Sequence, residues 1–171
     1  MEKILIISNT SFSIDKFRSH YLNKFDSKYK FLVCTPQNKP TTLGKINFTS
    51  FKSKNFFYEF LKILKIFNKF KPNKVIVYSL KYQFVIAILA IFKKLNLIFL
   101  IAGRGSFYLI KNPVIGFLRK IIFLFIFKMC QKIIFINPED KKFFIKNFNI
   151  KSKSYMIPTE GLKIIKFKNK I

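Results

Sequence analysis

The chain has 171 residues, half of them apolar and 18% aromatic, and 33 basic residues against 7 acidic ones give a net charge of +26. This length and apolar content suit a single folded domain with its own core and exclude an intrinsically disordered chain. The longest uncharged apolar runs, 82–92 and 121–127, are shorter than the about 18 residues of a membrane span. Because no secretory signal pattern is found either, we expect a cytoplasmic protein that does not cross a membrane.

Strand and helix patterns alternate along the chain, as apolar runs and helically spaced apolar residues indicate. In chain order the predicted strands are 3–8, 29–34, 46–49, 74–79, 97–102, 133–136 and 154–157. The predicted helices are 15–25, 55–70, 82–95, 113–130 and one beginning at Pro138, and 37–45 is predicted to be a polar loop. Strands separated by helices of this length form right-handed crossovers. We therefore predict an α/β, Rossmann-like domain with helices on both faces of a parallel sheet.

The positive charge has two explanations. A field of this sign attracts anionic partners such as lipid headgroups, nucleic acid or nucleotide sugars. Lysine, asparagine, isoleucine and phenylalanine are all abundant, however, which is typical of an A- and T-rich codon bias that makes lysine the common surface residue. The cations are spread along the chain and form no basic tail. Both explanations stay open on composition alone.

The clearest junction between a strand and a helix lies at Asn137. The apolar run 133–136 predicts a buried strand, Asn137 is a favoured helix N-cap, and Pro138 suits the first helical position. Glu139 and Asp140 fall in the first turn, where the helix dipole favours negative charge. Local physics alone explains this stretch as a well-formed turn.

Ligands of parallel α/β sheets bind beyond the carboxyl ends of the strands. Four predicted loops leave those ends, at 8–13, 79–82, 103–108 and 137–138. Asn9 and Thr10 could bond sugar hydroxyls, Gly103 and Gly105 would let backbone amides approach a phosphate or sugar, and the cations Lys81 and Arg104 suit an anionic group. Turn formation and solvation explain the same residues without a ligand.

The residues suggest neither a catalytic constellation nor a cofactor. Tyr108 breaks the Gly-x-Gly-x-x-Gly fingerprint, and there is no P-loop. Glu139 and Asp140 are adjacent, which suits capping better than acid–base chemistry. Cys34 and Cys130 each end an apolar run and are predicted to be reduced core thiols, and we expect no metal site.

Three segments carry a longer pattern: IFLIAGRGSFY at 98–108, KIIFINPEDKKFF at 132–144 and IPTEGLKIIKF at 157–167. In this order they resemble the N-terminal half of GT-B glycosyltransferases of the family-4 type. The opening strand and FKPNKVIVYSLK at 70–81 fit the same family. The matching residues are Gly103, Gly105, Phe135, Asn137, Pro138, Asp140, Pro158, Gly161 and Phe167.

The chain also departs from that family's pattern. Asn73 replaces the usual aspartate, Tyr78 and Ser79 stand where a histidine is usual, and Arg104 replaces an apolar residue. Lys163 and Ile164 occupy a region that tends to hold an aspartate. The family's pair of donor-binding glutamates, which belongs to the second domain, has no counterpart. These departures weaken inference about the ligand more than inference about the fold.

The resemblance implies an acceptor-side domain over 1–160, the start of an interdomain linker at 161–171, and a donor-side domain that this chain lacks. The complete enzyme would transfer a sugar from a nucleotide-sugar donor to a polysaccharide or lipid-linked acceptor, without a metal required by the fold. Truncation, or a split enzyme whose partner chain supplies the donor half, would explain the missing domain. The candidate substrate-binding residues are Asn9, Thr10, Lys81, Gly103, Arg104, Gly105, Asn137 and Glu160.

Three alternatives remain. The helix 113–130 is apolar nearly all round, which indicates burial first and, second, peripheral contact with an anionic membrane on its inner face. A basic nucleic-acid-binding protein fits the charge, although the aromatics lie at core spacing and no recognition motif is present. A non-catalytic partner of another transferase is the last alternative.

Overall fold

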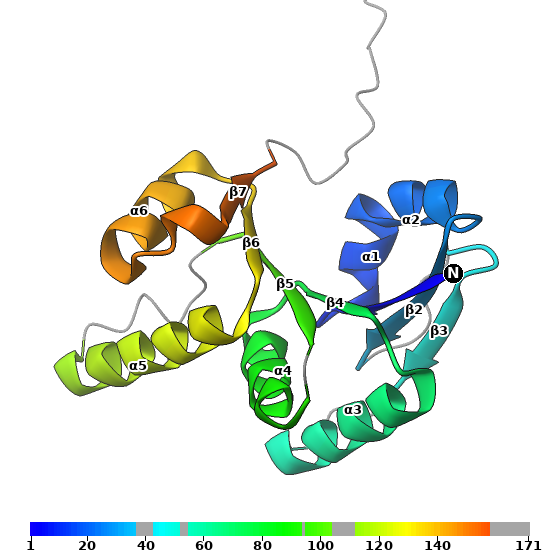
Figure 1. Ribbon diagram of the computed structural model, residues 1–171, viewed down its shortest axis with the longest axis horizontal. Coiled ribbons are helices and arrows are strands. Elements are labelled where there is room, and N and C mark those ends of the chain that lie inside the picture. The colour runs from blue at the N-terminus through cyan, green and yellow to red at the C-terminus, as the bar shows by residue number, and fades with distance from the viewer. Residues whose placement is uncertain (37–42, 52–54, 94, 104–111, 158–171) are drawn as a thin grey trace, which may run out of the picture.

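The computed structural model describes residues 1–36, 43–51, 55–93, 95–103 and 112–157. Within them, a seven-stranded sheet has the order β3-β2-β1-β4-β5-β6-β7, and every neighbouring pair is parallel (Figure 1). The strands are β1 (Glu2–Ile7), β2 (Tyr29–Thr35), β3 (Asn47–Ser50), β4 (Lys74–Val77), β5 (Asn96–Ile101), β6 (Lys132–Phe135) and β7 (Ser154–Met156). The predicted Rossmann-like α/β class is therefore confirmed.

Helices connect most of the successive strands, β2 and β3 excepted within the described residues, and cover both faces of the sheet. They are α1 (Ser11–Phe17), α2 (Ser19–Phe25), α3 (Phe56–Phe70), α4 (Leu80–Phe92), α5 (Pro113–Met129) and α6 (Pro138–Phe148), with a 3-10 turn at Lys151–Lys153. Figure 1 shows α1 and α2 on one side of the sheet and α3, α4 and α5 on the other. No helix in the described ranges is long and apolar enough to cross a bilayer.

Alternating strand residues build two separate cores. In β1, Ile4 and Ile6 pack with Ile14 of α1 and Leu22 of α2. The neighbouring Leu5 and Ile7 face the opposite way, into a larger core that α3, α4, α5 and α6 cover. Because side chains alternate across a strand, one apolar run supplies both layers.

Phenylalanine dominates the larger core where α5 meets α6. The rings of Phe123 and Phe127 lie 5.2 and 5.7 Å from the ring of Phe144, and the Phe148 ring lies 5.6 Å from that of Phe123. Phe135 of β6 also contacts Phe144, at 5.7 Å between ring centroids. This cluster fixes the two helices that follow β5 and β6.

The predicted single helix 15–25 is wrong in two respects. The helix begins earlier, at Ser11, because the Thr10 hydroxyl accepts a hydrogen bond from the Ser13 amide at 3.2 Å. It is then broken into α1 and α2 at Arg18, whose φ of −127° lies outside the helical region. Helix periodicity alone does not reveal this break, because the buried Ile14 and Leu22 have a spacing that a continuous helix would also place on one side.

Cys34 and Cys130 are free, buried thiols, as the sequence predicted. Burial raises the pKa of the Cys34 thiol to about 12. Burial also raises the pKa of the Cys130 thiol to about 12, although the nearby charge of Lys153 acts in the opposite direction. Both thiols therefore stay protonated in the folded chain over the whole neutral range.

Stability should fall as the pH rises above the pKa of an unfolded thiol, which is about 8.5. Between this pH and the pKa of the folded thiol, the unfolded chain binds fewer protons than the folded chain. Each thiol therefore lowers the unfolding free energy by about 1.4 kcal/mol per pH unit in that range. Urea unfolding with reductant at pH 8, 9 and 10 measures this slope. The Cys34→Ala variant should show a shallower fall than the wild type, and parallel profiles would contradict the prediction.

Candidate functional site

The carboxyl ends of the strands meet at one edge of the sheet, and the strand order changes direction at β1. From β1 the chain moves outward to β2 and β3 and then crosses back to β4 on the other side of β1. Such a switch point leaves a crevice beyond the carboxyl ends, which is where ligands of these folds bind. The predicted residues Asn9, Thr10, Lys81, Gly103 and Asn137 all follow carboxyl ends of strands, so the fold brings them to this edge.

The loop after β1 is held by hydroxyl groups. The buried Ser8 hydroxyl lies 2.7 Å from the Ser13 hydroxyl, which also donates to the Thr10 carbonyl at 3.0 Å. The Thr10 side chain caps α1, so its oxygen is engaged in the fold, whereas Asn9 is exposed at the edge. Of these two candidates, Asn9 is the better placed to meet a ligand.

Arg18 lies behind this loop and was missed by the sequence reasoning. Its guanidinium stacks 3.7 Å from the centre of the Tyr78 ring and donates to the Ser13 carbonyl at 2.6 Å. The hydroxyls of Tyr21 and Tyr78 share a hydrogen bond. Tyr78 stands where the family that this chain resembles has a histidine. Through these contacts it joins the end of β4 to α1 and α2 at the switch point.

A compositional signal could have pointed to Arg18. Only three of the 33 basic residues are arginine, at positions 18, 104 and 119. In a chain that otherwise uses lysine, arginine marks places where a planar, stacking cation is needed. Arg18 is one such place, because it is 4% exposed.

Lys81 is at the edge, as predicted, but its ammonium already has a protein partner. It pairs with the Glu59 carboxylate of α3, at 2.7 Å to each oxygen, and the Glu59 side chain is only 1% exposed. Burial and the nearby Glu59 carboxylate raise the pKa of the Tyr82 hydroxyl. An anionic ligand at Lys81 would have to share this cation with Glu59.

The Gln83 side-chain amide bridges the carboxyl ends of β4 and β5. Its nitrogen donates to the carbonyls of Val77 and Leu100, at 3.3 and 3.0 Å. Its oxygen is buried and has no hydrogen-bond partner within the residues that the structure describes. Sequence reasoning missed Gln83, although a single amide within the apolar run 82–92 is a signal that could have drawn attention to it.

Of the remaining candidates, the structure describes Gly103 and Asn137. A side chain at Gly103 would meet no atom within 4 Å among the residues that the structure describes. Asn137 caps α6 by accepting from the Glu139 amide at 2.8 Å, which confirms the predicted turn. Arg104, Gly105 and Glu160 lie outside the described residues, as do Pro158 and the predicted boundary at 160.

The Asn137 cap can be tested directly. Asn137→Ala should lower the unfolding free energy by about 1 kcal/mol, because the Glu139 amide loses its partner. Asn147→Ala is the matched control on the same helix, since the exposed Asn147 side chain donates to the Phe143 carbonyl of the preceding turn, at 2.7 Å, and caps no helix end. Urea denaturation should show little loss for the control, and equal losses would contradict the assignment.

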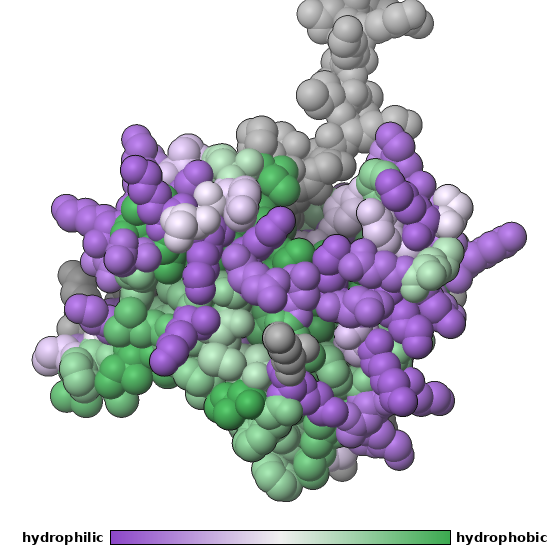
Figure 2. Space-filling model, viewed as in Figure 1, coloured by the Kyte–Doolittle hydropathy of each residue, from purple (hydrophilic) through white to green (hydrophobic). Residues whose placement is uncertain are grey.

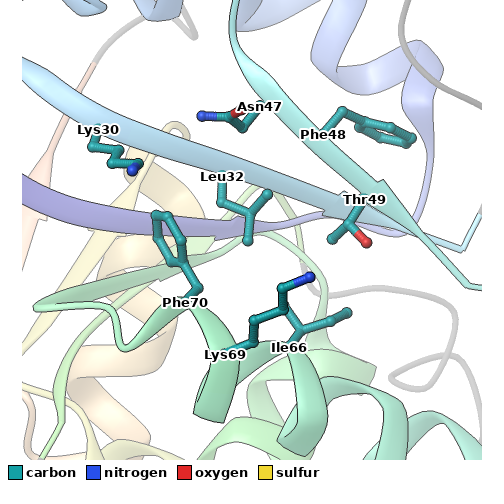
Figure 3. Close-up of a pocket in the computed structure, with 8 residues that line it drawn as sticks. All are labelled: Lys30, Leu32, Asn47, Phe48, Thr49, Ile66, Lys69 and Phe70. Carbon is teal, nitrogen blue, oxygen red and sulfur yellow. The ribbon is translucent and has the colours of Figure 1, made fainter.

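A separate groove lies at the β3 edge, away from the switch point. It has a volume of about 400 Å³ and runs between β2, β3 and the C-terminal turn of α3. Figure 3 shows Leu32, Thr49 and Lys69 turned toward its interior, while Phe48 points to the other face of the sheet. Its lining residues are Lys30, Leu32, Asn47, Phe48, Thr49, Ile66, Lys69 and Phe70.

The chain matches no protein-family model, and no curated protein matches it. Among solved structures, it is similar to a UDP-N-acetylglucosamine 2-epimerase from Rickettsia bellii, with a TM-score of 0.67, 16% identity and coverage of 94% of this chain and 45% of the other. Anabaena Alr3699/HepE in complex with UDP-glucose gives a TM-score of 0.63 and 12% identity, covering 92% and 43% of the two chains. The lipopolysaccharide outer core galactosyltransferase WaaB gives 0.62 and 10%, covering 91% and 44%.

At these identities the likeness establishes the fold alone. The chain spans less than half the length of each of these proteins. The matches cover more than 90% of the present chain. The chain therefore has the Rossmann-like α/β fold found in GT-B-type enzymes.

Proposed function

We propose that this chain is the N-terminal, acceptor-side half of a family-4-type GT-B glycosyltransferase. The complete enzyme transfers a sugar from a nucleotide-sugar donor to a polysaccharide or lipid-linked acceptor, as in the synthesis of cell-envelope polysaccharides. The observation that carries the proposal is the fold match, which covers more than 90% of this chain and 43–44% of the HepE and WaaB chains. The motifs at Gly103, Asn137 and Pro158, which occur in the order found in that family, support it.

The switch-point edge would bind the acceptor. Asn9 and the backbone at Gly103 would receive hydroxyl groups, and Lys81 would meet an anionic group in competition with Glu59. The donor nucleotide would be held by a second domain or a partner chain, because the donor-binding glutamates of the family that this chain resembles lie in that family's second domain. A lipid-linked acceptor would also place the protein peripherally on the inner face of the membrane.

Transfer assays test this proposal. The purified chain, incubated with UDP-glucose, UDP-galactose or UDP-N-acetylglucosamine and a membrane lipid extract, should give no glycosylated product. Co-expression with the reading frame just downstream, if that frame encodes a donor-side domain, should restore transfer. Turnover by the chain alone would contradict the division into halves, and so would a downstream frame whose donor-side product gives no transfer with it.

A second candidate function has one observation in its favour. Epimerases of UDP-N-acetylglucosamine are among the solved structures with the same fold. In that case the assembled enzyme would convert UDP-N-acetylglucosamine to its 2-epimer without any acceptor. Following the sugar nucleotide by NMR in the absence of lipid extract distinguishes the two, because an epimerase inverts the configuration at C2 of the sugar and a transferase does not.

A further inference from the structure

One side of α5 is apolar and exposed. Val114, Phe117, Leu118, Ile121 and Leu124 are each between 46% and 65% exposed. Their spacing of three or four residues places them on one side of the helix. The opposite side, with Phe123, Ile126 and Phe127, is buried against the sheet and α6. We refer to the five exposed residues as the α5 face.

The α5 face belongs to a wider apolar surface. The end of α4 exposes Ile91 and Phe92, and the N-terminal end of α3 exposes Phe57 and Leu61. The rings of Phe84 on α4 and Phe125 on α5 lie 6.0 Å apart and join the two helices. Figure 2 shows hydrophobic surface gathered over α5, α4 and the start of α3, whereas hydrophilic side chains cover most of the remaining view. A contiguous exposed surface of this kind is typical of an interaction site.

The positive charge around this surface favours an anionic partner. Lys120 and Lys128 are exposed along the edge of the α5 face. The sequence contains no acidic residue between Glu59 and Glu139, so α4 and α5 carry only positive charge. A second copy of the chain would bring another +26 to the same place and be repelled. An anionic lipid surface is complementary to both the apolar side chains and the lysines.

We propose that the α5 face docks the protein onto an anionic lipid bilayer. Phe117, Leu118 and Ile121 enter the boundary between headgroups and acyl chains, while Lys120 and Lys128 lie at the level of the lipid phosphates. The helix lies in the plane of the interface and does not cross it, in agreement with its length. This inference depends on the exposed residues of α5 and not on the sugar chemistry, so either proposal can fail without the other.

A single-tryptophan experiment tests the docking. The wild-type chain contains no tryptophan, so Phe117→Trp creates a unique emitter on the α5 face. Phe12→Trp is the matched control, because Phe12 is 62% exposed on α1, on the other side of the sheet. With phosphatidylglycerol-containing vesicles, Phe117→Trp emission should shift to the blue and be quenched by lipids brominated on their acyl chains. Phe12→Trp emission should change in neither respect.

Substitution of the face provides a second readout. Phe117→Ser combined with Leu118→Ser should weaken flotation with these vesicles at least tenfold at moderate salt, and Phe12→Ser should change it by less than twofold. Far-UV circular dichroism should show all variants folded, because the substituted side chains are exposed. Pure phosphatidylcholine vesicles should bind the wild type much more weakly, since the lysines then have no anionic surface to meet.

Several results would overturn the proposal. They are absence of binding to anionic vesicles, equal quenching of both tryptophans, and binding that salt abolishes but the serine substitutions leave intact. Concentration-dependent dimerisation that the substitutions abolish would assign the face to a second copy instead. Preference for single-stranded RNA over vesicles would assign the charge to nucleic acid.

Discussion

Phe144→Ala is expected to lower the free energy of unfolding by about 3–5 kcal/mol. Phe144 is fully buried and contacts the rings of Phe123, Phe127, Phe135 and Phe148, which come from α5, β6 and α6. Truncation removes the transfer free energy of the ring and leaves a cavity that four other rings cannot readily close. Because domains of this size are stable by only about 5–15 kcal/mol, the loss would be a large share of the total.

Urea or guanidinium unfolding, followed by circular dichroism, measures this change. Phe57→Ala is the control, since Phe57 lies on α3 with 68% of its surface exposed and should change the free energy by no more than about 0.5 kcal/mol. If both variants lost the same amount, the aromatic cluster between α5 and α6 would not be the packed core described above. The result bears on function because this cluster holds α6, and with it Asn137, against the sheet.

Lys81→Met should lower the free energy of unfolding by about 3 kcal/mol, the lower end of the range for breaking a buried ion pair. The lower end applies because Lys81 itself is 46% exposed, whereas the Glu59 side chain is 1% exposed. The substitution keeps the apolar stem of the side chain and removes the ammonium. The cost therefore arises from a carboxylate left in the interior without its cation, next to the buried Tyr82.

The double variant Glu59→Gln, Lys81→Met separates this cause from lost packing. Removing the carboxylate together with the ammonium should restore most of the stability, because no buried charge is then left alone. Chemical denaturation of the two single variants and the double variant completes the cycle. Additive losses would show that the pair does not interact across α3 and α4, and would leave Lys81 available for a ligand.

The Lys81–Glu59 pair also has a functional consequence. A sugar-transferring enzyme of the proposed type has anionic groups to hold, and Lys81 lies at the edge where they would arrive. Since Glu59 already neutralises it, Lys81 contributes less positive potential there than an isolated lysine would. The groups that remain best placed for a ligand in the described part of the edge are Asn9 and the backbone at Gly103.

Much of the site's position was predictable, since parallel strands share one carboxyl edge. Asn9, Lys81, Gly103 and Asn137 were placed there from strand boundaries that the structure reproduces to within about two residues at each end. The interaction partners of the side chains at this edge were less predictable. The caps by Thr10 and Asn137 are local and follow from residue type, and the cap by Asn137 was predicted, whereas the partners of Arg18, Lys81 and Gln83 lie on other elements.

The amino-acid sequence by itself determined the alternation of strands and helices, the Asn137–Pro138 helix start, the burial of both cysteines and hence the Rossmann-like class. These features depend on apolar periodicity and on backbone preferences within a few residues. Only the tertiary structure decided the break at Arg18, its stacking on Tyr78, the pairing of Glu59 with Lys81 and which side of α5 stays exposed. Those depend on which elements the crossovers bring together, and contacts between residues 20 to 60 positions apart leave no periodic trace along the chain.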